Sequence, residues 1–325
     1  MKRFFSLIIL SVLLVFFTAP HASATSYSDV PQSHPHFVAI NYLSDAGVLQ
    51  GYEGGLFKPD QLINRVEVLK VILVHAGVKF LEDGPDQVFS DVAKNQWFGL
   101  IVATAKGLGI VNGHPDGSFT PATNVRRAEF MKMMLETNHF KKTQWADQQL
   151  FTDVPKEEWH APYMNYAGKS GLINTDSNGK LYPSKELTRD EVAEMLYLMR
   201  VILKGGDTQF LLSQGEAQMA QIETYISAKN VAAAKRAAEL ALNMTQKAVL
   251  NVPNNTVALG AEKLADSYNL LVDSYIAATQ KDKEKATSLA NQSKEMATTA
   301  WEINNDIQLL ARHIKDRADE ILAQL

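Results

Sequence analysis

An arginine followed two residues later by a glutamate occurs three times in this chain, at intervals of 62 residues. The pairs are Arg65/Glu67, Arg127/Glu129 and Arg189/Glu191. Each pair stands where a helix is expected to begin, with Asn64, Arg126 or Thr188 as the N-cap residue. The glutamate then falls at position N3, where its carboxylate can bond back to the cap and meets the positive end of the helix dipole. We therefore assign the glutamates to helix capping.

The arginines do not fit a capping role, because a positive charge in the first helical turn opposes the dipole by roughly a few tenths of a kcal/mol. An arginine beside free helix N–H groups is instead a good site for a carboxylate or a phosphate. The alternative is a surface salt bridge to the following carboxylate. We predict that Arg65, Arg127 and Arg189 bind an anion.

These pairs belong to three units of 62 residues with one shared pattern. Each unit opens on Asp-Val, at Asp29, Asp91 and Asp153. A helix follows and is expected to end at a glycine in the left-handed conformation, at Gly47, Gly109 or Gly171. A Gly-containing turn then leads into the second helix, which starts with the Arg/Glu pair. One helix-turn-helix unit is too small to bury both of its helices, so we expect the three units to pack together.

Residues ~27 to 203 resemble the S-layer homology module on these motifs. The resemblance implies a pseudo-threefold arrangement with ligand grooves between neighbouring modules. It also implies that the protein is anchored to the bacterial cell wall through a pyruvylated secondary cell-wall polysaccharide. The pyruvyl carboxylate would bind Arg65, Arg127 or Arg189, and the sugar hydroxyls would donate to an opening aspartate.

Other residues of the modules are candidate ligand contacts, each with a structural alternative. Trp97 and Trp159 could present an apolar face to a sugar ring, or could belong to the core. Gly51 and Gly113 could let the backbone approach a ligand, or could serve only the turn. Asp29, Asp91 and Asp153 could bind sugar hydroxyls, or could form caps and turns.

The three modules depart from the shared pattern at several positions. The first has Pro35 where the others have tryptophan, and the third has Thr175 where the others have glycine. Only the third has the usual threonine before the arginine, because the others have Asn64 and Arg126. We therefore expect that not every groove binds ligand, and we place the groove of Arg127 first.

The chain begins with a charged head, an apolar run from Phe4 to Phe17 and a small-residue site at Ala22-Ser23-Ala24, which predicts a signal peptide over residues 1–24. No later stretch is apolar enough to span a membrane, so we expect a secreted protein at the cell surface or cell wall. The chain has no cysteine, which excludes disulfides and cysteine catalysis. Its net charge of −4 makes a nucleic-acid partner unexpected.

The remaining residues differ in composition and predict a helical bundle. We place the boundary at Lys204-Gly205-Gly206-Asp207, with modules at about 27–88, 89–150 and 151–206 and a helical domain over 207–325. Two apolar seams of coiled-coil type run from Val257 and from Ala286. We expect four antiparallel helices, the last spanning ~40 residues or about 60 Å. Part of its seam would then contact the modules or a second copy of the chain, or the region would act as a spacer.

The predicted protein is mostly α, with three helix-turn-helix modules in a pseudo-threefold arrangement followed by an antiparallel helical bundle. We predict a non-enzymatic wall anchor without cofactor, whose partners are the wall polysaccharide and a protein, or another copy, bound by the helices. The alternatives are a wall-tethered enzyme with its activity in the helical region, an adhesin, or an S-layer lattice component. We predict no metal site, because the calcium-like run from Asn174 lacks its bidentate ligand and nothing near His34 and His36 completes a site.

Overall fold

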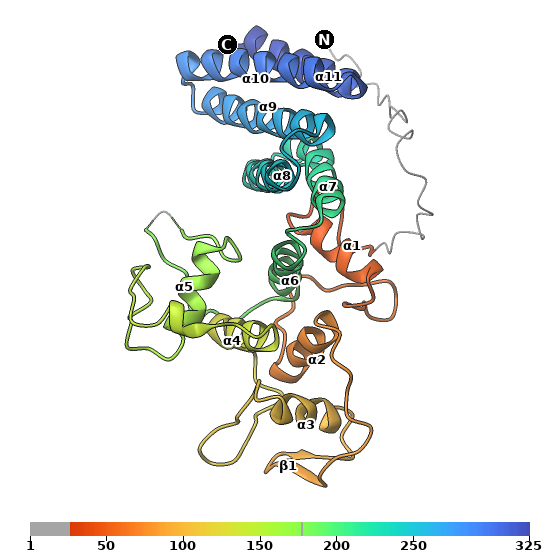
Figure 1. The fold of residues 1–325 in the computed structure, drawn as a ribbon, viewed down its shortest axis with the longest axis vertical. Coiled ribbons are helices and arrows are strands. Elements are labelled where there is room, and N and C mark those ends of the chain that lie inside the picture. The colour runs from red at the N-terminus through yellow and green to blue at the C-terminus, as the bar shows by residue number, and fades with distance from the viewer. Residues whose placement is uncertain (1–26, 177) are drawn as a thin grey trace.

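The computed structural model describes residues 27–176 and 178–325, and Figure 1 shows their arrangement. The predicted signal peptide lies outside the described residues. The module region, residues 27–203, contains the first six α-helices and one short hairpin. The helices are α1 (Phe37–Asp45), α2 (Arg65–His75), α3 (Gly99–Gly107), α4 (Arg127–Thr137), α5 (Ala161–Lys169) and α6 (Arg189–Leu203). Strands β1 (Gln87–Phe89) and β2 (Val92–Ala93) pair antiparallel, and the 3-10 helix η1 (Lys142–Gln144) precedes α5.

The second helix of each module begins where the sequence predicts. Helices α2, α4 and α6 start at the three arginines, and each N3 glutamate accepts the N–H of its N-cap residue. These bonds measure 3.2 Å for Glu67, 3.0 Å for Glu129 and 3.3 Å for Glu191. Asn64 completes the box by accepting the Glu67 N–H at 2.9 Å. The capping role predicted for the glutamates is therefore confirmed.

Three backbone hydrogen bonds close the modules into a ring. Val125 donates to the carbonyl of Ile63 (3.0 Å), Leu187 to Val125 (3.1 Å), and Ile63 back to Leu187 (3.1 Å). Each donor lies just before a second helix and is related to the others by the 62-residue repeat. Because the third bond returns to the first module, the arrangement is cyclic and pseudo-threefold, as predicted.

Helix packing follows the same cycle. The second helix of each module packs on the first helix of the next: α2 on α3, α4 on α5, and α6 back on α1. These three pairs form three lobes around the ring, which can be followed in Figure 1. The first helices are followed by Gly47, Gly109 and Gly171 at φ of +69°, +74° and +78°. The glycine helix ends predicted from the sequence are confirmed.

The helical region contains five α-helices rather than the four expected. They are α7 (Thr208–Ser227), α8 (Val231–Asn251), α9 (Thr256–Thr279), α10 (Lys283–Ile303) and α11 (Gln308–Gln324). The predicted ~40-residue last helix is wrong: it breaks at Asn304, and the short 3-10 helix η2 (Asn305–Ile307) reverses the chain. Asn304 accepts the N–H of Asp306 at 3.1 Å, as a capping asparagine does.

The chain after the break runs back along α10. The apolar seam from Ala286, part of which was expected to contact the modules or a second copy of the chain, is therefore buried inside the bundle. Lys294 pairs with Asp319, and Lys315 donates to Thr298 at 3.2 Å, which sets α10 and α11 antiparallel. Small residues line the contact: Ala290, Ala297, Ala300, Ala311 and Ala318 are all buried. Helix α11 also packs on α9.

The helical region joins the module region at the lobe of α6 and α1. Asp207 caps α7 by accepting the N–H of Phe210 at 3.0 Å, as expected. Leu211, Met244 and Ala248 belong to the same buried core as the modules. None of the helices in the described ranges combines the length and the apolar character that a bilayer crossing requires.

Candidate ligand grooves between the modules

One groove between modules is seen directly as a surface cavity of about 270 Å³. It is lined by Arg127 of the second module, Asn174, Glu191 and Glu194 of the third, and His36 of the first. We call it the third groove. The 62-residue repeat places equivalent residues in two further positions around the ring.

The first groove is defined by Arg189, Lys70 and Trp97, and the second groove by Arg65, Lys132 and Trp159. The corresponding residues of the third groove are Arg127, Glu194 and Pro35. The three grooves therefore share the arginine and differ in the other two positions.

The arginines reach across to the next module around the ring. Arg65 donates to the Glu129 carboxylate at 3.2 Å, and Arg127 to Glu191 at 3.3 Å. Arg189 donates from Nε to the carbonyl of Phe57 and from an Nη to that of Gln50, both at 2.9 Å. Each arginine thus pairs with groups of the neighbouring module rather than with the glutamate that follows it in sequence.

The helix N–H groups beside the arginines are not free, which corrects the expectation of open backbone donors. The N–H of Arg65 donates to Thr123 (2.9 Å), that of Arg127 to Lys185 (2.8 Å) and that of Arg189 to Gln61 (3.0 Å). The following residue in each helix also donates to the neighbouring module. These donors hold the ring together, so an anion in a groove would have to bind through side chains.

The guanidinium groups lie at the base of the grooves and keep only a small exposed surface. The side chains of Arg65 and Arg127 are 12% and 11% exposed. Burial lowers the pKa of Arg65, and the nearby Glu129 partly offsets this effect. A guanidinium carries five N–H donors, so the bonds to the neighbouring module leave donors over. An anion in the groove could use these donors.

The opening aspartates hold the turn before each second helix. Asp91 accepts the N–H groups of Phe119 and Thr120 at 2.8 and 2.7 Å, and Asp29 and Asp153 make the same pair of bonds in their own modules. The second donor is at positive φ each time, +58° for Thr120. The turn-forming alternative for these aspartates therefore describes what both carboxylate oxygens do in the structure.

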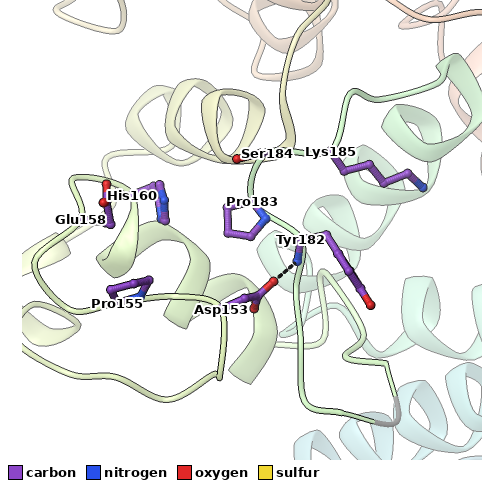
Figure 2. Close-up of a pocket in the computed structure, with 8 residues that line it drawn as sticks. All are labelled: Asp153, Pro155, Glu158, His160, Tyr182, Pro183, Ser184 and Lys185. Atoms are coloured by element: carbon purple, nitrogen blue, oxygen red, sulfur yellow. Dashed lines mark hydrogen bonds between the residues drawn. The ribbon is translucent and has the colours of Figure 1, made fainter.

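Asp153 also lines an open surface cavity of about 520 Å³, drawn in Figure 2. Glu158 and His160 line the same cavity, whereas the side chain of Lys185, at its edge, points away from them and pairs with Glu191. The His160 ring lies 5.3 Å from the ring of Trp159, so this cavity adjoins the second groove. A sugar bound at Trp159 could extend into it and meet both acidic and basic groups.

The predicted glycines serve close packing within their modules. A Cβ atom on Gly51 would lie 2.3 Å from the ring of Tyr27, and one on Gly113 would lie 2.4 Å from the ring of Phe89. The aromatic residue that opens each of these two modules thus packs directly on the glycine backbone. Close packing therefore explains why glycine stands at both positions, without any contact to a ligand.

The two tryptophans are exposed rather than buried. Trp97 is 61% exposed and Trp159 is 53% exposed. The Lys70 ammonium lies 5.7 Å from the ring centre of Trp97, and Lys132 lies at the same distance from Trp159. The alternative that these side chains belong to the core is therefore wrong. Each pair combines an apolar ring face with a positive charge.

Sequence reasoning missed the residues that distinguish the grooves. Lys70, Lys132 and Glu194 occupy equivalent positions five residues after the arginine, and reading the repeat column by column would have found them. Arg236 of α8, which enters the third groove, has no equivalent in the repeat. Nothing in the sequence links it to this site.

The two histidines and the calcium-like run that the sequence analysis rejected as metal sites make other contacts in the structure. His34 and His36 both lie 3.8 Å from Asp190, within the third lobe. Asp176 accepts the N–H groups of Asn178 and Lys180 at 2.8 and 2.9 Å, which makes it a turn former. Among the residues that the structure describes, no group of three or more His, Asp or Glu side chains is arranged to hold a metal ion.

Comparison with known proteins identifies the modules. The profile of the S-layer homology domain matches residues 26–69, 88–131 and 150–193. An S-layer protein of Bacillus licheniformis is 28% identical over 54% of this chain and 20% of its own length. A cellulosome-anchoring protein of Acetivibrio thermocellus is 29% identical over 42% of this chain and 31% of its own length. An uncharacterized cell wall amidase of Bacillus anthracis is 25% identical over 58% of this chain and 34% of its own length.

The chain spans between about a fifth and a third of the length of these relatives. The matches start at intervals of 62 residues, which is the period read from the Arg/Glu pairs. The domain type and the relatives make this a secreted protein of the cell surface. Residues 26–193 belong to the S-layer homology domain family as three tandem copies.

Proposed function

We propose that the module region anchors the protein non-covalently to the bacterial cell wall by binding a pyruvylated secondary cell-wall polysaccharide in the first and second grooves. The observation that carries this proposal is the repeated pairing of an exposed tryptophan with a lysine, Trp97 with Lys70 and Trp159 with Lys132. The names of the S-layer and cellulosome-anchoring relatives support attachment to the wall.

The chemistry of these two grooves suits an acidic sugar. The exposed ring offers an apolar face to the C–H groups of a pyranose, and burying an aromatic face against a ligand contributes strongly to binding. The ammonium beside the ring and the guanidinium beneath it offer charge-assisted hydrogen bonds to a carboxylate. We propose that the pyruvyl carboxylate sits between them.

The sequence analysis placed the groove of Arg127, the third groove, first for glycan binding. We now propose that the other two grooves bind the glycan. The third groove has Pro35 in place of the tryptophan and Glu194 in place of the lysine, so it lacks both features that favour an acidic sugar. We propose Arg65 and Arg189 as the arginines that contact the glycan. Asp29, Asp91 and Asp153 act first as turn formers, and any contact with sugar hydroxyls would be additional.

Retention of the full chain on purified cell walls tests this function. Walls carrying the pyruvylated polymer should retain the protein, and walls from which the pyruvyl group has been removed should not. A matched sample with increasing salt should elute the protein gradually, because exposed charge pairs are screened. Retention that is unchanged without the pyruvyl group would refute the carboxylate mechanism.

The rival function, an enzyme tethered to the wall, is favoured by the amidase relative. The helical region does contain an open cavity of about 680 Å³, with Glu223 and Glu320 on its wall. Arg317 pairs with both carboxylates and lies 3.3 Å from Glu223. His313 and Arg317 lower the pKa of Glu223 despite its burial, which makes this carboxylate a poor general acid near neutral pH. We therefore propose a non-enzymatic role for this region.

We propose that the helical region is a carrier that holds an interaction surface away from the wall. The buried seam between α10 and α11 is satisfied inside the bundle, so it offers no free surface to a second copy of the chain. Self-association would have to use other faces. Light scattering of the full chain across a concentration series would reveal it.

A further inference from the structure

We propose that the third groove is the docking site of the protein's own helical region, with Arg236 of α8 bound where the other two grooves take the acidic sugar. This inference rests on the proposed function of the first and second grooves. It assigns a different ligand class to the third groove, a cation in place of an anion, and it names the occupant.

The charge of the third groove is reversed relative to the others. Position 194 is glutamate where the equivalent positions hold Lys70 and Lys132. Asp190, whose equivalents are Val66 and Ala128, lies outside the groove lining, 3.8 Å from both His34 and His36. The lining of the third groove therefore has one more carboxylate and one ammonium fewer than that of either partner, and His36 lies 3.5 Å from the added carboxylate of Glu194. A carboxylate ligand would be repelled there, and a guanidinium would be attracted.

Arg236 fills that position with several contacts. Its Nε lies 3.8 Å from Oε1 of Glu194, and it donates from one Nη to the side-chain oxygen of Asn174 at 3.1 Å. The other Nη donates to the carbonyl of Gly171 at 3.4 Å. Its side chain is 28% exposed and that of Glu194 is 14% exposed, so the pair is only partly screened by water.

The rest of the interface covers the site where the tryptophan stands in the other grooves. Tyr225 of α7 is buried and donates to the carbonyl of Pro35 at 3.3 Å. Gln218 approaches the hydroxyl of Tyr197 at 3.5 Å, and the rings of Phe210 and Tyr42 lie 6.0 Å apart. Tyr225 thus covers the backbone at Pro35, the position that holds the tryptophan in the other grooves, and this adds steric shielding to the difference in charge.

This arrangement gives each of the three grooves a use. Two grooves hold the wall polymer, and the third fixes the direction in which α7 and α8 leave the ring. Figure 1 shows the consequence, because α9, α10 and α11 lie at the opposite end of the molecule from α2 and α3. The helical region is then a rigid mount and not a flexibly tethered domain.

A charge-swap cycle in the full chain tests the docking. We would prepare Arg236→Glu, Glu194→Arg and the double swap, and follow hydrogen exchange of the amides at residues 33–37 and 171–175. Each single variant should exchange about tenfold faster there, because like charges then meet in the groove. The double swap should recover most of the protection. Arg312→Glu, which makes the same charge change on an exposed part of α11, serves as the control.

The outcomes separate this inference from the proposed function. Unchanged exchange in both single variants, or a double swap as fast as either single variant, would overturn the docking. Binding of wall polysaccharide is titrated in the same samples, and the unmodified chain should bind two equivalents. A third equivalent would also overturn the docking. Binding of none would remove the proposed function, and the exchange data would still decide whether α8 occupies the groove.

Discussion

The first and third grooves lie in equivalent positions of the repeat and differ in the side chains that line them. Both lie between modules joined by the same ring of hydrogen bonds, and both have an arginine that reaches into the next module. The first has an exposed tryptophan and a lysine, whereas the third has a proline, a glutamate in place of the lysine, and Arg236. The comparison teaches that the repeat fixes the scaffold while the outward-facing side chains vary, and we propose that these side chains select the ligand.

The largest expected effect comes from removing the feature that sets the first two grooves apart. The double variant Trp97→Ala/Trp159→Ala should weaken wall binding more than a hundredfold, since each ring contact contributes about 1.5 kcal/mol. Two-site attachment to a polymer increases the loss further. A wall sedimentation assay measures it. Leu108→Ala, at another exposed apolar residue, should bind as well as the unmodified chain. Equal binding of the double variant would move the glycan away from the tryptophans.

A second asymmetry lies in the core of the first module and predicts acid sensitivity. Burial and the nearby Arg200 lower the pKa of His75 to about 4, while the equivalent positions hold Thr137 and Met199. A histidine with a depressed folded-state pKa stabilises the fold above its unfolded pKa and loses that contribution as pH falls. The free energy of unfolding should therefore drop by about 3 kcal/mol between pH 7 and pH 4 through this residue alone.

Urea unfolding at both pH values measures the effect of His75. The variant His75→Phe should lose most of this pH dependence, and His114→Phe, at an exposed histidine, should keep it. An unchanged pH dependence in His75→Phe would show that other groups control acid unfolding.

Replacing the opening aspartate should lower the free energy of unfolding by a similar amount in each module, whereas the groove residues differ between modules. Asp91→Ala removes the acceptor of two backbone N–H groups and should lower the free energy of unfolding by about 2 kcal/mol. Asp29→Ala and Asp153→Ala should lower it by a similar amount, because their bonds are the same. Asp116→Ala, in an exposed turn, is the control and should cost clearly less. A large difference between the three variants would contradict the equivalence of the lobes.

The smallest expected effect comes from giving the first groove the charge of the third. Lys70→Glu should reduce glycan affinity at that groove about tenfold, because it places a carboxylate beside the ring and the incoming anion. Calorimetric titration should then resolve one unchanged site and one weakened site. Lys283→Glu, on the exposed start of α10, carries the same charge change and should leave both sites intact. Two unchanged sites in Lys70→Glu would remove the lysine from the groove.

The sequence predicted those parts of the fold that local rules control. The period of the Arg/Glu pairs set the modules, the N3 glutamates set the helix starts, and Gly47 and its equivalents set the helix ends. Each of these depends on backbone conformation within one short segment. The break at Asn304 was not predicted, because apolar residues continue at helical spacing through Ile303, Ile307 and Leu310. Periodicity alone does not distinguish a straight helix from two helices folded on one another.

The candidate site was predicted less completely, for a physical reason. The direction of an arginine depends on which module follows it around the ring, and that is a property of the closed assembly. Arg65 therefore contacts Glu129, a residue 64 positions away, and not the neighbouring Glu67. The entry of Arg236 into the third groove depends on how two regions dock, which no repeat pattern records. The sequence left open whether Trp97 and Trp159 belong to the core, and the structure shows that both are exposed; their contact with a glycan stays a prediction.

A crystal structure of the full chain soaked with a purified pyruvylated wall glycan tests the central claim most directly. We expect glycan against Trp97 and Trp159, with the carboxylate near Lys70 and Lys132, and Arg236 still in place in the third groove. Glycan seated against Arg127 with Arg236 displaced, or bound far from both tryptophans, would contradict it.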